Sequence, residues 1–108
     1  MIGSQTWMAQ NLNYATGNSW CYGNNSSNCA KYGRLYAWET AKSVCPEGWH
    51  LPSDGEWSTL ENVVGSDAGK RIKSRSWDGT DAYGFNILPS GLRGHDGSFG
   101  YVGSNAYF

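Results

Sequence analysis

A chain of 108 residues has room for one ordinary domain, and we take residues 1–108 as a single domain. Its formal net charge is -1 and only 16% of its residues are charged, so the sequence offers no basic patch for a nucleic acid or an anionic membrane. The unusual numbers are 6 Trp, 7 Tyr and 15 Gly, which together predict an irregular, loop-rich domain with aromatic side chains in its core.

The sequence contains no segment that resembles a membrane anchor. No stretch approaches the roughly 18 apolar residues that a membrane-spanning helix needs. The first residues, Met1-Ile2-Gly3-Ser4-Gln5, have neither the basic start nor the apolar run of a signal peptide. The chain therefore either stays in the cytosol or has lost a leader, and its cysteines favour the second alternative.

The first predicted element is a strand or extended segment over residues 5–13. Residues 15–28 are rich in Asn, Ser and Gly, and this composition predicts a loop. No repeat, linker or low-complexity tract interrupts the chain, which again favours a single domain.

The next predicted element is a helix over residues 32–44. Leu35, Trp38 and either Ala41 or Lys42 recur at helical spacing, and a proline at position 46 would end the helix. Cys45 continues the same stripe, so we expect it at the buried edge of the helix end.

A second helix is signalled by a capping box at its start. Ser53 can accept a hydrogen bond from the amide of Glu56, whose carboxylate can reach back to the Ser53 amide. One face of the helix then carries three apolar side chains, Trp57, Leu60 and Val64. A glycine follows at position 65 and would cap the C-terminal end.

The rest of the chain predicts short elements separated by glycines. A third short helix is expected over residues 67–74, and strands are expected over residues 85–88 and 100–108. The predicted fold class is α+β, with two helices packed on a small, irregular antiparallel sheet.

The three cysteines predict one crosslink. Cys21 and Cys29 flank a polar, flexible insert and lack the C-x-x-C spacing of zinc ligands or redox dithiols, so a short disulfide-closed loop is the preferred interpretation. Two free thiols are the alternative. Cys45 has no partner by this pairing, and an odd cysteine in a secreted domain suggests that its partner is missing.

Residues that could support catalysis have simpler interpretations. His50 lies in a tight turn with no cysteine or acid at ligand spacing, which favours a structural role. His95 and Asp96 stand near Ser98 in a glycine-flanked turn, but catalytic triads are assembled in space and not from loop neighbours. We therefore predict no catalytic residue and no enzyme activity.

Acidic residues give no better case for a metal or a hydrolase. Asp78 and Asp81 could offer oxygens to calcium, but the spacing of a calcium-binding EF-hand loop is absent. A glycosidase would need two carboxylates about 5–9 Å apart in a cleft, from candidates at Glu39, Glu47, Glu56 and Glu61. The cap explains Glu56, and exposed helix faces explain Glu39 and Glu61, so we predict no metal and no cofactor.

The aromatic residues are the best candidates for ligand binding. Trp38, Trp49 and Trp57 are expected in the core. Four aromatics fall in predicted loops, where an exposed ring would be a stacking platform for sugar or protein: Trp20, Tyr22, Trp77 and Tyr83. Half-buried loop anchors are the alternative for these four.

Four motifs, together with Cys21 and Cys29, resemble one known family in order and spacing. They are WMAQNLNY at 7–14, YGRLYAW at 32–38, CPEGWHLPS at 45–53 and GFNILPSG at 84–91. The pattern is similar to the Fibrobacter succinogenes major paralogous domain family and spans nearly the whole chain. The family has no well-established activity, and its members look like extracellular or outer-membrane-anchored bacterial proteins.

The resemblance also implies where this chain departs from the family. Members usually continue with a further strand and a late cysteine, which would be the partner of Cys45, so we expect this chain to be truncated at its C-terminus. An open sheet edge would then allow a homodimer. The layout resembles the C-type-lectin-like fold, although fold does not settle function.

These observations predict a non-catalytic extracellular surface module for adhesion or carbohydrate binding. The expected partner is a polysaccharide or a surface protein, and the expected location is extracellular or at the outer-membrane surface. The alternative is a structural or protein–protein interaction domain of a larger secreted or outer-membrane-anchored protein.

Overall fold

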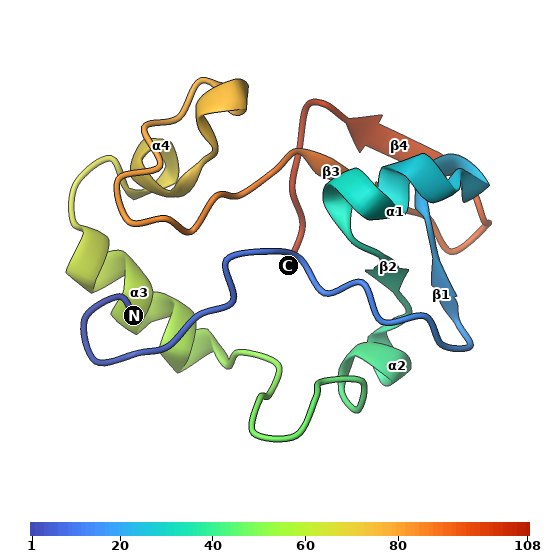
Figure 1. Ribbon diagram of the computed structural model, residues 1–108, viewed down its shortest axis with the longest axis horizontal. Coiled ribbons are helices and arrows are strands. Elements are labelled where there is room, and N and C mark those ends of the chain that lie inside the picture. Colours follow the sequence, from blue (N-terminus) through green and yellow to red (C-terminus); the bar gives the residue numbers. More distant parts are fainter. The chain divides into compact units, whose positions relative to one another are not determined.

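The computed structural model describes residues 1–108 and has an α+β fold, which confirms the predicted class (Figure 1). It contains short helices and two antiparallel sheets of two strands each. The chain divides into two compact units. The first unit comprises Met1–Gln10 and Pro52–Leu88, and the second comprises Asn11–Leu51 and Pro89–Phe108.

The first unit is built on α3 (Asp54–Val64), which confirms the helix predicted from the capping box. Ser53 Oγ accepts from the Glu56 amide at 3.2 Å, and Glu56 Oε1 accepts from the Ser53 amide at 2.9 Å. Gly65 follows with φ +80°, a left-handed backbone that glycine adopts without steric cost. The predicted third helix is also present as α4 (Ala68–Ile72) and is followed by the 3₁₀ turn η2 (Arg75–Trp77).

The core of the first unit is small and aromatic. Four hydrophobic side chains are buried: Ile2, Leu60, Val64 and Phe85. The Trp7 ring packs 4.8 Å from the Trp57 ring and 5.4 Å from the Phe85 ring, measured between centroids. Trp57 is therefore a core residue, as predicted, and α3 contributes Trp57, Leu60 and Val64 to this core.

The strand predicted over 85–88 does not form, and of the two alternatives for residues 5–13, a strand or an extended segment, the strand does not form. Only isolated bridges occur there, between Ile2 and Gln5 and between Lys73 and Ile87. Asn86 has φ +59°, and this left-handed backbone interrupts the extended run. Near the N-terminus, the Gln5 side chain donates to the Glu56 carbonyl at 3.1 Å, so the segment is anchored to α3 by a side-chain hydrogen bond.

The second unit consists of short elements, including two strand pairs. Strand β1 (Ser19–Trp20) pairs with β2 (Leu35–Tyr36), and β3 (Ser90–Arg93) pairs with β4 (Phe99–Val102). Two helices and a 3₁₀ turn complete the unit: η1 (Tyr22–Asn24), α1 (Ser26–Tyr32) and α2 (Trp38–Ala41). Strand β4 overlaps the strand predicted over 100–108, but the pairing ends at Val102.

The helix predicted over residues 32–44 is reduced to α2 (Trp38–Ala41), and the predicted loop over 15–28 contains η1 and the start of α1. Helix α1 starts after Asn25, whose Oδ1 accepts from the Ser27 amide at 3.0 Å. It ends at Gly33, which has φ +76° and where a Cβ would lie 2.8 Å from the Leu12 carbonyl oxygen. A helix cannot continue through this left-handed, crowded position, so the following residues form β2.

The shorter helix changes the expected burial of three residues. Trp38 is 66% exposed and Trp49 is 40% exposed, so the prediction that they are core residues is wrong. Cys45 lies beyond the end of α2, is half-buried, and has a free thiol. The periodicity of residues 32–44 therefore does not mark one buried helical face.

The predicted disulfide is present between Cys21 and Cys29, and an arginine lies against it. Arg34 Nη1 is 3.5 Å from Cys29 Sγ and 3.6 Å from Cys21 Sγ. Its Nε donates to Ser19 Oγ at 3.0 Å, and its Nη2 donates to the Ser19 carbonyl at 3.2 Å. One guanidinium thus joins β1, the disulfide and the start of β2.

We predict unequal losses of stability at two sites of α3. Ser53→Ala should lower the free energy of unfolding by about 1 kcal/mol, because the N-cap acceptor is lost. Trp57→Ala should lower it by roughly 3–5 kcal/mol, because the large side chain packs on Trp7 and Phe85. Urea unfolding followed by circular dichroism measures both values.

Ser58→Ala is the matched control, since Ser58 is an exposed serine inside the same helix. It should change the free energy of unfolding by less than about 0.5 kcal/mol. Equal and small losses for Ser53→Ala and Trp57→Ala would contradict this description of the first unit.

A second prediction concerns the crosslink. The double variant Cys21→Ala/Cys29→Ala should lose roughly 2–3 kcal/mol of stability, because the disulfide closes only a short loop in the unfolded chain. Denaturant unfolding of the variant and the oxidised wild type gives the difference. Peptide mapping of the wild type without reductant should recover Cys21 and Cys29 joined, and their recovery as free thiols would refute the pairing.

Candidate functional site

The four aromatics predicted as ligand contacts are divided between the two units. Trp20 and Tyr22 belong to the second unit, whereas Trp77 and Tyr83 belong to the first. Only Tyr83 is exposed; the other three are half-buried. Their role in ligand binding stays a prediction.

Three of these rings have partners within the chain. The Arg93 guanidinium carbon lies 3.9 Å from the centre of the Trp20 ring, and Lys73 Nζ lies 4.7 Å from that of Trp77. The Tyr22 ring packs on Phe99 with centroids 5.3 Å apart. These contacts match the alternative interpretation of half-buried loop anchors, because a cation or a second ring already occupies one face.

Exposed aromatic side chains are concentrated in the second unit. The first unit exposes only Tyr83, while six rings are exposed in the second: Tyr14, Trp38, Trp49, Tyr101, Tyr107 and Phe108. Exposed apolar surface marks a binding site where it forms a contiguous patch. The second unit is therefore the better place to look for one.

Tyr101 and Tyr107 form a pair that we call the tyrosine corner. Their ring centroids are 6.4 Å apart with planes inclined by 57°, and the side chains are 61% and 51% exposed. The amides of Ser104 and Asn105 both donate to the Tyr101 carbonyl at 3.0 Å. These bonds close the turn that brings the final residues back to β4.

The backbone of Tyr101 is left-handed, with φ +68°. In a regular strand, Tyr101 would share a face with Phe99, which is half-buried against Tyr22. The left-handed residue breaks this alternation, and the Tyr101 ring is exposed instead. Such a conformation costs about 1–3 kcal/mol for a bulky residue, so it must be held by its surroundings.

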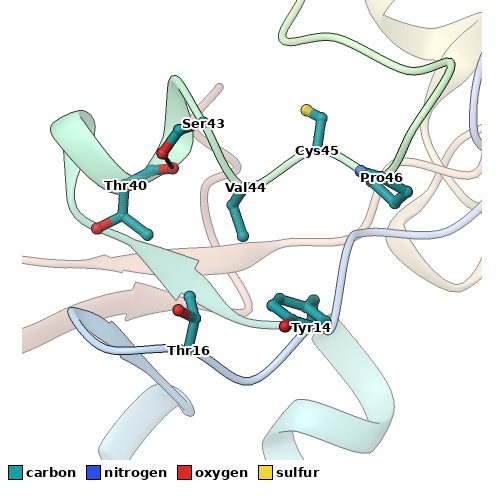
Figure 2. Close-up of a pocket in the computed structure, with 7 residues that line it drawn as sticks. All are labelled: Tyr14, Thr16, Thr40, Ser43, Val44, Cys45 and Pro46. Atoms are coloured by element: carbon teal, nitrogen blue, oxygen red, sulfur yellow. Dashed lines mark hydrogen bonds between the residues drawn. The ribbon is translucent and has the colours of Figure 1, made fainter.

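A shallow hollow of about 380 Å³ lies elsewhere in the second unit (Figure 2). Seven residues line it: Tyr14, Thr16, Thr40, Ser43, Val44, Cys45 and Pro46. Figure 2 shows Tyr14 and Thr16 on one wall, facing the segment that runs from Thr40 to Pro46. The Val44 side chain points towards the Tyr14–Thr16 wall, while the Cys45 sulfur points away from it.

Asp96 and Ser98, which were considered for acid–base chemistry, bond to each other within one turn. Asp96 Oδ1 accepts from Ser98 Oγ at 2.7 Å and from the Ser98 amide at 3.0 Å, and these bonds hold the pKa of Asp96 below its ordinary value. His95 and His50 are both exposed. The arrangement around Asp96 is that of an exposed turn at the tip of the β3–β4 hairpin.

Other acidic side chains also make local contacts, each with a residue close in the sequence. Asp81 Oδ1 accepts from the Asn86 amide at 2.8 Å, and Glu39 pairs with Lys42 at 2.7 Å on the surface of α2. No group of three or more His, Cys, Asp or Glu side chains lies close enough to hold a metal ion.

Sequence reasoning missed both the tyrosine corner and the hollow. Tyr101 and Tyr107 were included in a predicted strand, where alternation alone does not distinguish an exposed ring from a buried one. The flanking glycines at positions 100 and 103 are the signal that this strand is irregular. The hollow has no sequence signal, because its walls come from segments more than twenty residues apart.

No helix of the structure is long and apolar enough to cross a membrane.

Comparison with known proteins identifies the family of this chain. No curated protein and no solved structure matches the chain. The sequence model of the Fibrobacter succinogenes major domain matches residues 1–108, which include all the motifs quoted above. This chain therefore belongs to the Fibrobacter succinogenes major domain family.

Proposed function

We propose that this chain is a non-catalytic extracellular module that binds carbohydrate, with the tyrosine corner as its stacking surface. The observation that carries the proposal is that Tyr101 is exposed on a left-handed backbone, beside a second exposed tyrosine. Strained residues are concentrated at functional sites, because a purely structural position would favour glycine there.

The chemistry of the tyrosine corner suits a sugar. Each ring offers an apolar face to the C–H groups of a pyranose and a hydroxyl that can bond to its polar edge. Two tilted rings can contact two faces of a ligand or two neighbouring sugar units. A polysaccharide is the partner that uses both contacts at once, and avidity then compensates for weak single contacts.

The disulfide indicates an oxidising compartment, either extracellular or periplasmic. Display at the outer-membrane surface is part of our proposal, because a polysaccharide-binding module has to meet its ligand outside the cell. The homodimer through an open sheet edge stays a prediction.

A surface protein is the second candidate partner. Val102 and Phe108 are also exposed, and they add apolar surface from the same stretch of chain as Tyr101 and Tyr107. An apolar area of this kind fits the core of a protein interface as well as a sugar. The experiment below separates the two candidates.

The test is a glycan array that includes plant-wall polysaccharides, followed by affinity electrophoresis on each polysaccharide that binds. Tyr101→Ala and Tyr107→Ala should each weaken binding by about tenfold or more, as expected for central aromatic contacts. Tyr101→Gly should lose binding equally and should raise the free energy of unfolding by up to about 1 kcal/mol, because glycine relieves the left-handed backbone.

Trp38→Ala is the matched control, since Trp38 is as exposed as Tyr101 and lies on α2 of the same unit. It should bind like the wild type. Arrays without any retained glycan would reject carbohydrate binding and favour a protein partner. A large loss of stability in Tyr101→Gly would show that Tyr101 supports the fold and is not held exposed for a ligand.

A further inference from the structure

The hollow between the Tyr14–Thr16 segment and the Thr40–Pro46 segment is chemically different from the tyrosine corner (Figure 2). Four of its seven lining residues carry hydroxyl groups: Tyr14, Thr16, Thr40 and Ser43. None of the lining residues carries a carboxylate, an ammonium or a guanidinium group. The hollow therefore offers hydrogen bonds without a charge that would attract an ion.

Most of these hydroxyls are available to a ligand. The side-chain hydroxyls of Tyr14, Thr16 and Thr40 make no hydrogen bond within the chain. Ser43 Oγ makes one long bond, to the Thr40 carbonyl at 3.4 Å. Each hydroxyl can donate one bond and accept others, which matches the paired donor and acceptor character of a sugar hydroxyl.

Hydrogen bonds within the chain hold the walls of the hollow in place before any ligand binds. Tyr36 Oη donates to the Tyr14 carbonyl at 2.8 Å, and burial raises the pKa of Tyr36. The Thr16 amide donates to Ser19 Oγ at 3.2 Å. On the opposite wall, the Ser43 amide donates to the Thr40 carbonyl at 3.0 Å. A wall that is ordered in advance reduces the entropy lost on binding.

Size and exposure limit the ligand to a small one. A volume of about 380 Å³ is near the lower end of the roughly 300–1,000 Å³ typical of ligand sites. The Tyr14 side chain is 61% exposed, so its ring can stack on one face of a bound group. One pyranose ring fits these limits better than a longer oligosaccharide.

We propose that this hollow binds a single neutral pyranose unit, as a second contact of the module with its glycan. The identity of the ligand class rests on the proposed carbohydrate-binding function, but the residues are independent of the tyrosine corner. A uronic acid is disfavoured, because its carboxylate would lose water without meeting a positive charge.

The test is a titration of the ¹⁵N-labelled chain by two-dimensional NMR, which suits a protein of 11.8 kDa. The probes are the methyl pyranosides of glucose, galactose, mannose and xylose, with glucuronic acid as the charged comparison. At least one neutral probe should shift the amides of Tyr14, Thr16, Thr40 and Ser43 in a saturable way. A Kd on the order of 1 mM is expected for so small a ligand.

Variants test whether the hydroxyls provide the contacts. Thr16→Val and Thr40→Val keep the side-chain shape and remove one hydroxyl each, so each should weaken binding by about three- to tenfold. The matched control is Thr80→Val, because Thr80 is an exposed threonine of the first unit and does not line the hollow. It should bind the probe like the wild type.

The location of the shifted amides distinguishes failure of this proposal from failure of the proposed function. Shifts confined to residues around Tyr101 and Tyr107 would overturn the hollow as a site and leave the tyrosine corner in place. Shifts at the hollow without any shift around Tyr101 and Tyr107 would support the hollow and overturn the tyrosine corner as a site. No shift with any neutral probe, shifts unaffected by Thr16→Val and Thr40→Val, or tighter binding of glucuronic acid would each reject the hollow as a site for a neutral sugar.

Discussion

The Arg34 guanidinium joins parts of the second unit that have almost no buried apolar surface to hold them together. Cys29 and Pro89 are the only buried apolar side chains of this unit, whereas Ile2, Leu60, Val64 and Phe85 are buried in the first. Arg34 contacts both sulfurs of the disulfide and bonds twice to Ser19. Hydrogen bonds from a charged group contribute about 1.5–3 kcal/mol each, so this network can replace part of a missing core.

This difference in what holds each unit together explains why aromatic residues pack in the core of one unit, while several are exposed in the other. In the first unit, Trp7, Trp57 and Phe85 pack against one another and provide the core. The second unit is held by a disulfide, an arginine and short strand pairs, so its aromatic side chains are not all needed inside. Tyr101 and Tyr107 can then be exposed, which is the physical basis of the proposed binding function.

The sequence predicted the elements whose signals are local. The capping box at Ser53 and the pairing of Cys21 with Cys29 were confirmed, because each depends on residues only a few positions apart. The first half of the helix predicted over 32–44 was wrong, because Gly33 lies against Asn11 and Leu12, about twenty residues earlier in the chain. No window of local periodicity contains that contact.

The candidate site was less predictable than the fold for the same reason. Sequence reasoning selected aromatic residues in loops, and it could not anticipate that Arg93 covers Trp20. Neither could it anticipate the left-handed backbone of Tyr101, since a tyrosine rarely adopts φ +68° and no local pattern marks it.

The central claim is that polar and covalent contacts around Arg34, and not an apolar core, hold the unit that displays the tyrosines. Amide hydrogen exchange of Arg34→Met tests it directly, since methionine keeps the length of the side chain and removes its donors. The Ala37 amide, which bonds to the Asn18 carbonyl beside the β1–β2 pair, should lose protection by about ten- to a hundredfold. The Gly65 amide, bonded to Glu61 at the end of α3, should keep its protection. Unchanged exchange at Ala37, or an equal loss at both amides, would contradict the claim.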